Sequence, residues 1–244
     1  ELKKVFNKKV MANVGGFSID EYIECCTLLD KEDQIGWFEI NISCPNVHAG
    51  GVNFGTNAKN AADVISAVKK VVSKPVIAKL TPNVTDITEI AVACEQAGAD
   101  AISLINTLLG MRIDLKTRKP VIANKMGGFS GPAIKPVALR MVYQVYDAVK
   151  IPIIGMGGIS TAENVIEMML AGATGVQVGA AIFADHVLAK NVSRGAVFLG
   201  ESKLCESLRK LHLTRRVSPV KTLGRGEIHI HRQRHIGDPG SGTG

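Results

Sequence analysis

Short apolar runs alternate along this chain with longer amphipathic stretches, and this alternation constrains the fold more than any other feature. Runs as apolar as these are typical of parallel strands that are covered on both faces. Their separation by helical stretches, with about 20–30 residues per repeat, is typical of βαβ units. We expect strands at 10–14, 37–43, 75–80, 101–106, 151–155 and 175–180, and helices at 18–29, 58–72, 86–97, 132–149 and 161–171.

Two architectures fit this alternation: an open doubly wound sheet and a closed (β/α)₈ barrel of the TIM type. The ends of several different strands carry polar residues, namely Asn13, Asn41, Lys79 and Asn106. A barrel spreads its functional groups around many strand ends, whereas an open sheet concentrates them at one switch point. We therefore predict an incomplete barrel in which about six of the eight βα units are present and two are missing at the front.

The chain is expected to divide into a partial barrel over 1–185 and an atypical tail over 186–244. The tail carries 11 Lys and Arg against 4 Asp and Glu, whereas the rest of the chain carries 18 of each, and five of the six histidines lie in the tail. Its composition predicts poor order, with a short basic helix at 204–213. The abrupt change suits a frameshifted or chimeric gene end. Within 1–185, the long connection 107–131 has no helical pattern and is typical of a loop with a function.

Cysteine usage and hydropathy exclude several classes of protein. The five cysteines are an odd number without a CxxC pair, which argues against a disulfide framework or a zinc site and favours a reduced, cytoplasmic setting. No apolar run reaches the length of about 18 residues that a membrane helix needs, and the charged start has no signal-peptide core. The histidines of 228–235 lack carboxylate or cysteine partners at ligand spacing, so we expect no metal.

The turn Asn41-Ile-Ser-Cys-Pro-Asn46 follows the second expected strand, at a position where a barrel keeps its catalytic groups. Pro45 stops the strand and stiffens the turn that presents Cys44. A buried structural cysteine is the commoner alternative. A core cysteine, however, does not need amide and hydroxyl neighbours, so the turn favours a functional Cys44. Lys79 ends another apolar strand, where its ammonium group either meets an anionic partner or ligand or reaches outward to solvent.

Two glycine-rich turns follow successive strands: Ile154-Gly-Met-Gly-Gly-Ile159 and Gly179-Ala-Ala. The first leads into Ser160-Thr-Ala-Glu163, which has the pattern of a capping box at a helix start. Glycines let the backbone approach a phosphate, and a helix N-terminus offers amide donors. Loops after the last two strands form the usual phosphate site of a barrel. The pair of turns therefore predicts a phosphorylated cofactor or substrate, with tight turns of no further function as the alternative.

Five ordered segments together resemble class 1 dihydroorotate dehydrogenases. The Thr-Pro-Asn and Asn-Thr-Leu-Leu-Gly-Met motifs are similar to subclass 1B, whose members pair with an iron–sulfur flavoprotein subunit. The segments are Asn41-Ile-Ser-Cys-Pro-Asn46, Ala78-Lys-Leu-Thr-Pro-Asn-Val-Thr-Asp86, Ile105-Asn-Thr-Leu-Leu-Gly-Met111, Gly127-Gly-Phe-Ser-Gly-Pro-Ala-Ile-Lys-Pro136 and Ile154-Gly-Met-Gly-Gly-Ile159.

The resemblance implies an FMN-dependent oxidation of (S)-dihydroorotate to orotate in pyrimidine biosynthesis. Cys44 would be the general base and Lys79 would stabilise negative charge on the reduced flavin. Electrons would pass to NAD⁺ through a partner subunit that carries FAD and [2Fe-2S], within a homodimer and a heterotetramer. The residues that would line FMN are Asn13, Asn41, Lys79, Ile105, Gly131, Gly157, Gly158, Gly179 and Ala180, and those that would contact the pyrimidine are Asn41, Asn106 and Thr107.

Three other interpretations stay open at the level of sequence. The Ser-Cys-Pro and Lys-Leu-Thr-Pro-Asn motifs are shared with the pyrimidine-reducing domain of dihydropyrimidine dehydrogenases, although Asn46 favours the dihydroorotate enzyme. A second interpretation is a non-catalytic protein whose basic tail binds nucleic acid with a salt-dependent affinity. The third is an inactive fragment. The last two depend on the tail or on the missing front, whereas the ordered motifs lie in the neutral part of the chain.

Overall fold

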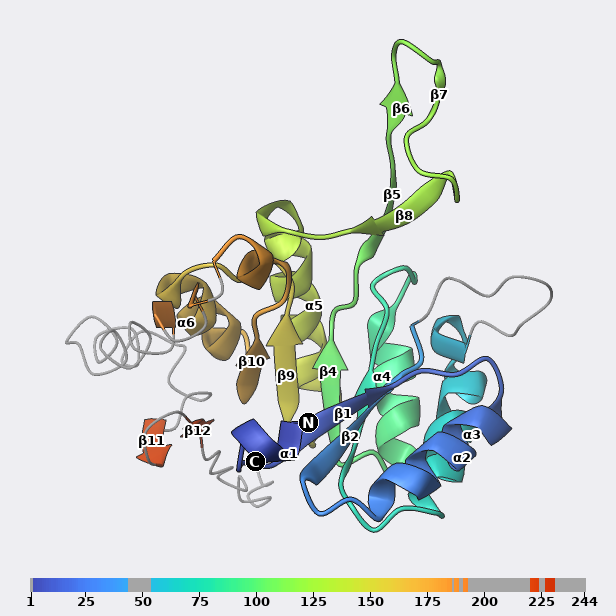
Figure 1. Ribbon diagram of the computed structural model, residues 1–244, viewed down its shortest axis with the longest axis vertical. Helices are drawn as coiled ribbons and strands as arrows, with labels where there is room; N and C mark the ends of the chain where they lie inside the picture. Colours follow the sequence, from blue (N-terminus) through green and yellow to red (C-terminus); the bar gives the residue numbers. More distant parts are fainter. Residues whose placement is uncertain are drawn as a thin grey trace, which may run out of the picture.

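A computed structural model describes residues 2–43, 54–185, 187–188, 191–192, 220–223 and 227–230. Its main body is a six-stranded parallel sheet in the order β1-β2-β3-β4-β9-β10 (Figure 1). The strands are β1 (Val10–Val14), β2 (Ile35–Asn41), β3 (Val76–Lys79), β4 (Ala101–Leu104), β9 (Ile153–Met156) and β10 (Gly175–Gln177).

Helices connect successive strands of this sheet, as a βαβ chain requires. They are α2 (Ile19–Asp30), α3 (Ala58–Lys69), α4 (Ile87–Gln96), α5 (Lys135–Ala148) and α6 (Ala162–Leu170), with a short α1 (Leu2–Val5) before β1 and single 3₁₀ turns η1 (Phe54–Thr56), η2 (Pro132–Ile134) and η3 (Ala180–Phe183). All the expected strands and helices of the barrel part are confirmed, with ends that differ by up to three residues. The short α1 was not expected.

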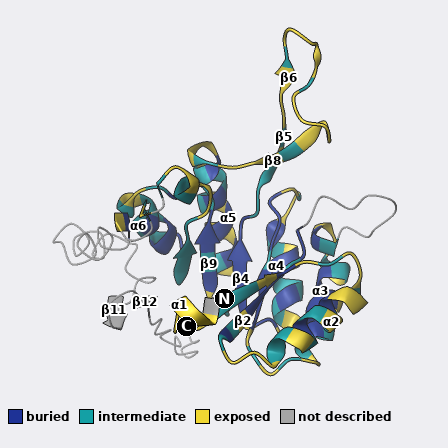
Figure 2. Cartoon of the chain, in the orientation of Figure 1, coloured by how far each residue is buried: buried dark blue, intermediate teal, exposed yellow. Residues whose placement is uncertain are grey.

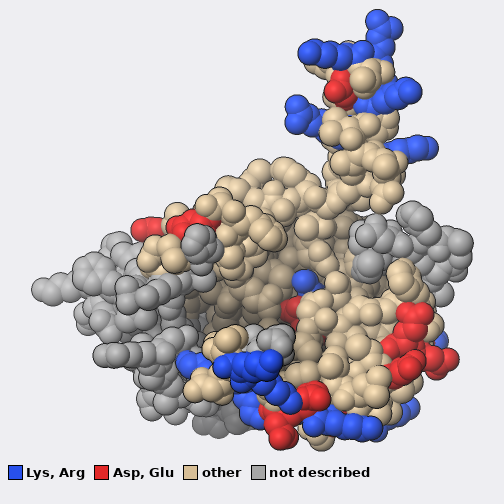
Figure 3. Space-filling view, viewed as in Figure 1, with Lys and Arg blue, Asp and Glu red and all other residues tan. Residues whose placement is uncertain are grey.

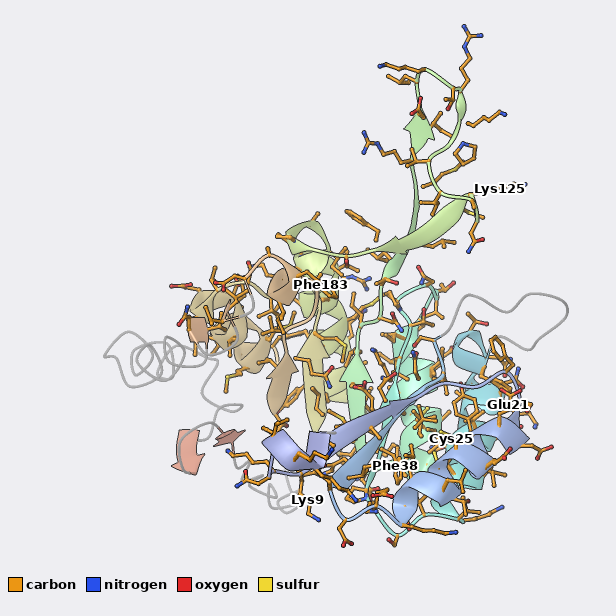
Figure 4. The ribbon with its side chains drawn as sticks, in the orientation of Figure 1. Lys9, Glu21, Cys25, Phe38, Lys125 and Phe183 are labelled. Atoms are coloured by element: carbon orange, nitrogen blue, oxygen red, sulfur yellow. The ribbon has the colours of Figure 1, made fainter. Side chains whose placement is uncertain are left out.

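Side chains alternate between the two faces of the sheet, since successive residues of a strand point in opposite directions. The outer face carries apolar residues such as Phe38, Ile102 and Ile153, which are fully buried against the helices (Figures 2 and 4). Burial of this face accounts for most of the hydrophobic core and supplies the main driving force for folding. The inner face carries Glu39 and Lys79, so the concave side of the sheet becomes polar toward the carboxyl ends of the strands.

One long-range hydrogen bond shows that the sheet curls as a barrel does. Gln177 Nε2 on β10 donates to Glu39 Oε1 on β2 at 2.9 Å, although three strands separate β2 from β10 in the sheet. In an open sheet, adjacent strands are only about 4.8 Å apart but three intervening strands would hold the two side chains far from contact. The fold is therefore an incomplete (β/α)₈ barrel, as the distribution of polar strand ends predicted.

The connection 107–131 forms a projecting arm (Figure 1). Its strands β5 (Leu108–Met111) and β8 (Met126–Phe129) pair antiparallel, and β6 (Ile113–Asp114) pairs with β7 (Lys119–Pro120) beyond them. Asn83 holds the base of the arm, because its Nδ2 donates to Thr107 O at 3.0 Å and its Oδ1 accepts from Leu109 N at 2.9 Å. Basic side chains cover the far end of the arm (Figure 3). The sequence predicted a loop here but not the antiparallel pairing of its strands.

Two strands of the tail are described, β11 (Val220–Leu223) and β12 (Glu227–Ile230), and they pair antiparallel. The helix expected at 204–213 lies outside the described residues. Within the ranges that the structure describes, no helix is both long enough and apolar enough to cross a bilayer.

Helix α6 begins with a capping box, one residue later than the sequence pattern suggested. The N-cap is Thr161 rather than Ser160, and its partner is Asn164 rather than Glu163. Thr161 Oγ1 accepts from Asn164 N at 3.3 Å, while Asn164 Oδ1 accepts from Thr161 N at 3.2 Å and from Ser160 N at 3.1 Å. This cap fixes the start of the helix directly after the glycine turn at 157–158.

Removal of this cap is expected to weaken the fold measurably. Thr161→Ala should lower the free energy of unfolding by about 1 kcal/mol, because the amide of Asn164 loses its acceptor. Urea unfolding followed by circular dichroism measures the change. Thr161→Ser keeps the hydroxyl and should retain most of the stability. Equal losses in both variants would show that the methyl group of Thr161, rather than its hydrogen bond, matters.

Candidate functional site

A cavity of about 590 Å³ opens at the carboxyl ends of β3, β4, β9 and β10. This is the end of the strands at which barrel enzymes bind their ligands. Figure 3 looks onto the concave side of the sheet, which is hollowed below the arm, and charged side chains lie inside this hollow. The predicted site residues that line the cavity are Lys79, Ile105, Asn106, Thr107, Gly131, Gly157, Gly158, Gly179 and Ala180.

Two of the predicted site residues that the structure describes do not line this cavity. Asn41 is hydrogen-bonded to Asn106, which lines the cavity, whereas Asn13 is hydrogen-bonded to Glu39, which in turn contacts the lining residue Lys79. Cys44 lies outside the described residues, so its predicted role as the base stays a prediction. Ser43, which precedes Cys44, is described, and its Oγ donates to Lys79 O at 2.8 Å. The residue before Cys44 is thereby held beside the end of β3.

A chain of amide groups runs along the wall formed by β2 and β4. Asn106 Nδ2 donates to Asn41 Oδ1 at 3.2 Å, and Asn106 Oδ1 accepts from Thr107 N at 2.7 Å. The Tyr22 hydroxyl group donates to Asn41 O at 2.9 Å from helix α2. These bonds hold the Asn106 amide in one orientation at the cavity surface. Asparagine side chains offer both a donor and an acceptor, so they suit hydrogen bonds to a planar ligand with amide edges.

An ionic cluster lies on the concave face of the sheet beside the cavity. Glu39 is only 3% exposed and accepts hydrogen bonds from Asn13 Nδ2 at 2.5 Å and Gln177 Nε2 at 2.9 Å. Lys79 Nζ is 3.8 Å from Glu39 Oε2. Of the two alternatives for Lys79 in the sequence, the anionic partner is the one found. The sequence did not predict Glu39 and Gln177 as site residues. Glu39 could have been found, because it is an acidic residue two positions before Asn41 and so lies on the same face of the strand.

The glycine turns have backbone conformations that favour glycine. Gly131, Gly157 and Gly158 have φ angles of 103°, 120° and 71°, which side chains with a Cβ rarely adopt. At Gly158 an added Cβ would lie 2.9 Å from Gly131 O, so the turn at 157–158 touches the backbone at Gly131. At Gly131 and Gly179, by contrast, an added Cβ would meet no described heavy atom within 4 Å. The backbone therefore borders open space where these two glycines line the cavity.

The rim of the cavity continues into η3. Ala181 and Ala184 line the cavity, and Phe183 between them is 96% exposed (Figure 4). Ser130, Met156, Ser160 and Gln177 also belong to the wall and were not predicted. Ser130, Met156 and Ser160 already lie within the quoted motifs, and Gln177 lies two positions before Gly179.

Two of the described cysteines lie in the helical layer and not at the cavity. Burial raises the pKa of the Cys26 thiol on α2 and of the Cys94 thiol on α4, each to about 12. A thiol with such a pKa stays protonated at neutral pH and cannot accept a proton. Within the described ranges, no group of three His, Cys, Asp or Glu side chains could hold a metal ion.

The curled parallel sheet, with its polar strand ends and touching glycine turns, defines a ligand-binding (β/α)₈-barrel protein. Residues 1–197 match the model of the dihydroorotate dehydrogenase family. The match covers most of the chain, and the chain therefore belongs to the dihydroorotate dehydrogenase family.

Relatives with curated names are catalytic subunits of dihydroorotate dehydrogenase B. The dihydroorotate dehydrogenase B (NAD(+)) catalytic subunit of Alkaliphilus oremlandii is 58% identical over 190 residues, which are 78% of this chain and 63% of that protein. The subunit of the same name from Alkaliphilus metalliredigens is 60% identical over 178 residues, covering 73% of this chain and 59% of that protein. That from Geotalea uraniireducens is 54% identical over 192 residues, covering 79% and 63%. The chain thus spans less than two thirds of the length of these relatives.

A solved structure supports the fold independently. The crystal structure of dihydroorotate dehydrogenase from Eimeria tenella in complex with ferulenol has a TM-score of 0.63 with this chain at 18% sequence identity. The likeness covers 79% of this chain and 56% of the other. It supports the incomplete barrel, since most of this chain matches little more than half of the other chain.

Proposed function

We propose that this chain is the FMN-binding part of a class 1B catalytic subunit that oxidises (S)-dihydroorotate to orotate in pyrimidine biosynthesis. One observation carries the proposal: in a member of this family, a cavity at the carboxyl ends of the strands brings together Lys79, Asn106 and two glycine turns. The overall class of reaction is an oxidation at a carbon–carbon bond. Its substrate is an anionic pyrimidine with amide edges, which amide and ammonium groups can bind.

The residues present fit FMN. A volume of about 590 Å³ lies within the range of roughly 300–1,000 Å³ that small-molecule and cofactor sites occupy. Gly131 and Gly179 border open space, so the backbone can come close to a phosphate there. Lys79 supplies a cation at the other side of the cavity, suited to a ring that gains negative charge. When bound, FMN would supply the hydride acceptor that no amino-acid side chain provides.

The proposed roles follow the chemistry of the oxidation, which removes a proton from one ring carbon and a hydride from its neighbour. Cys44 takes the proton as general base. Asn41, Asn106 and Thr107 bind and orient the pyrimidine. The residues proposed to hold FMN are Asn13, Asn41, Lys79, Ile105, Gly131, Gly157, Gly158, Gly179 and Ala180.

The proposal extends to the partners of the chain. The relatives are named NAD(+)-dependent catalytic subunits, which supports a second subunit that takes the electrons. We place FAD and [2Fe-2S] on that subunit, in a heterotetramer built on a homodimer of catalytic subunits. A cytoplasmic location agrees with the free thiols of Cys25, Cys26 and Cys94.

Flavin binding by the purified chain tests the proposal. FMN fluorescence should be quenched on titration with the chain, and anaerobic (S)-dihydroorotate should then bleach the absorbance of the bound flavin. The catalytic subunit of Alkaliphilus oremlandii serves as the positive control. Dihydrouracil should not bleach the flavin; bleaching by dihydrouracil alone would favour the dihydropyrimidine dehydrogenase interpretation. A chain that binds no FMN where the control binds it would contradict the proposed function.

A further inference from the structure

Glu39 is the buried charged group that neither the motifs nor the proposed reaction uses. It lies on β2 between Phe38 and Ile40, with 3% of its surface exposed. Burial of a carboxylate at such depth has a large desolvation cost, which only hydrogen bonds and opposite charges can offset. A position whose only requirement was packing would therefore carry an apolar side chain.

The two oxygens of this carboxylate have different partners. Oε1 accepts from Gln177 Nε2 at 2.9 Å, which ties β2 to the far edge of the curled sheet. Oε2 accepts from Asn13 Nδ2 at 2.5 Å and lies 3.8 Å from Lys79 Nζ. Lys79 and Gln177 both line the cavity, whereas Glu39 does not. Glu39 thus lies behind two groups that face a ligand and contacts both of them.

The charge balance at this wall depends on Glu39. Lys79 presents a positive charge to the cavity, and its side chain is 18% exposed. The carboxylate at 3.8 Å offsets that charge. Two unit charges about 10 Å apart, at an effective dielectric constant of about 20, interact strongly enough to change a binding constant more than tenfold. The presence or absence of one negative charge behind Lys79 therefore alters how strongly the cavity prefers a reduced, negatively charged ligand.

We infer that Glu39 is a positioning residue, which holds Lys79 at the cavity wall and offsets its charge, and so sets the preference of the site for reduced over oxidised FMN. The inference deepens the proposed function and rests on it. Glu39 acts through Lys79, and Gln177 and Asn13 hold the carboxylate in place for that task. A purely structural Glu39 would brace the sheet without acting on the charge of the cavity.

The first measurement is the ratio of the dissociation constants of oxidised and reduced FMN. Glu39→Gln removes the negative charge with little change in shape. We expect reduced FMN to gain at least tenfold over oxidised FMN, which corresponds to a rise of about 30 mV in the two-electron midpoint potential. Asp63→Asn, at an exposed residue paired with Lys59, makes the same change in net charge far from the cavity and should leave the ratio unaltered. An unchanged ratio in Glu39→Gln overturns the inference.

A double-mutant cycle shows whether the effect passes through Lys79. In a Lys79→Met background, Glu39→Gln should shift the ratio less than threefold, because the charge that Glu39 offsets is gone. A shift of the same size with and without Lys79 would contradict the positioning role. Glu39→Asp keeps the charge and should stay within about threefold of the wild-type ratio. A folded Glu39→Asp protein with the ratio of Glu39→Gln would also overturn the inference.

A measurement without flavin separates this inference from the proposed function. Trace acetylation of the whole chain followed by peptide mass spectrometry gives the reactivity of Lys79 relative to Lys59 in the same sample. Glu39→Gln should raise the relative reactivity of Lys79 severalfold, and Asp63→Asn should raise that of Lys59 instead. Unchanged reactivity of Lys79 in a folded variant sinks the positioning role even if FMN binds. Failure of the wild-type chain to bind FMN contradicts the proposed function, and this acetylation result still decides whether Glu39 positions Lys79.

Discussion

Replacement of Cys44 by alanine is expected to slow the dihydroorotate-driven bleaching of bound FMN by about 10²–10⁴-fold, the usual contribution of a positioned general base. FMN should stay bound, because the groups proposed to hold it are elsewhere in the chain. Stopped-flow absorbance under anaerobic conditions measures the rate. The wild-type rate should rise with pH as the thiolate forms, and the residual rate of the variant should lose this dependence.

The control for this substitution is Cys25→Ala. Cys25 lies on α2, in the helical layer around the sheet (Figure 4), so its loss should leave the bleaching rate unchanged. Neither Cys26 nor Cys94 can replace Cys44, since burial raises the pKa of each thiol to about 12. Bleaching at the wild-type rate in Cys44→Ala would remove Cys44 from the proposed reaction.

The substitution Gly158→Ala should cost the protein both stability and flavin. The φ angle of Gly158 is 71°, which is unfavourable for alanine. The new Cβ would lie 2.8 Å from Lys135 Cβ, 2.9 Å from Lys135 N and 2.9 Å from Gly131 O. Backbone atoms cannot move aside as the end of a flexible side chain can. Strain and overpacking together should lower the free energy of unfolding by about 2–4 kcal/mol. Because Gly131 and Gly158 both line the cavity, their forced separation should also weaken FMN binding.

Urea unfolding and FMN titration of the same preparation test both effects. Gly175→Ala is the matched control, since an added Cβ at Gly175 would meet no described heavy atom within 4 Å. We expect its free energy of unfolding to stay within about 0.5 kcal/mol of the wild type. If Gly158→Ala were as stable as Gly175→Ala and retained FMN, the close contact between the two glycine turns would not matter for the site.

The elements of the barrel part could be predicted because their signals are local. The run Val76–Ala78 is apolar and ends at Lys79, and the glycines at 157 and 158 lie where the backbone has positive φ. Each of these features depends on residues within a few positions, so periodicity and turn chemistry suffice. The start of α6 was misplaced by one residue because Ser160 and Thr161 are equally good caps, and only the contacts of Asn164 distinguish them.

The cluster around Glu39 could not be predicted in the same way. Glu39 and Gln177 are 138 positions apart in the chain, and neither residue has a pattern that names the other. The arm was likewise predicted only as a loop, because the pairing of β5 with β8 depends on hydrogen bonds between strands rather than on the pattern within one strand.

The amino-acid sequence by itself determined the succession of strands and helices, the positions of the glycine turns and the membership of Lys79 and Asn106 in a strand-end site, because short-range sterics and hydrophobic periodicity control these features. Only the tertiary structure decided that Glu39 meets Lys79, Asn13 and Gln177, and that the backbone at Gly131 touches the turn at 157–158. Those contacts join segments far apart in the chain, and they exist only where the curled sheet brings its strands together on the concave side.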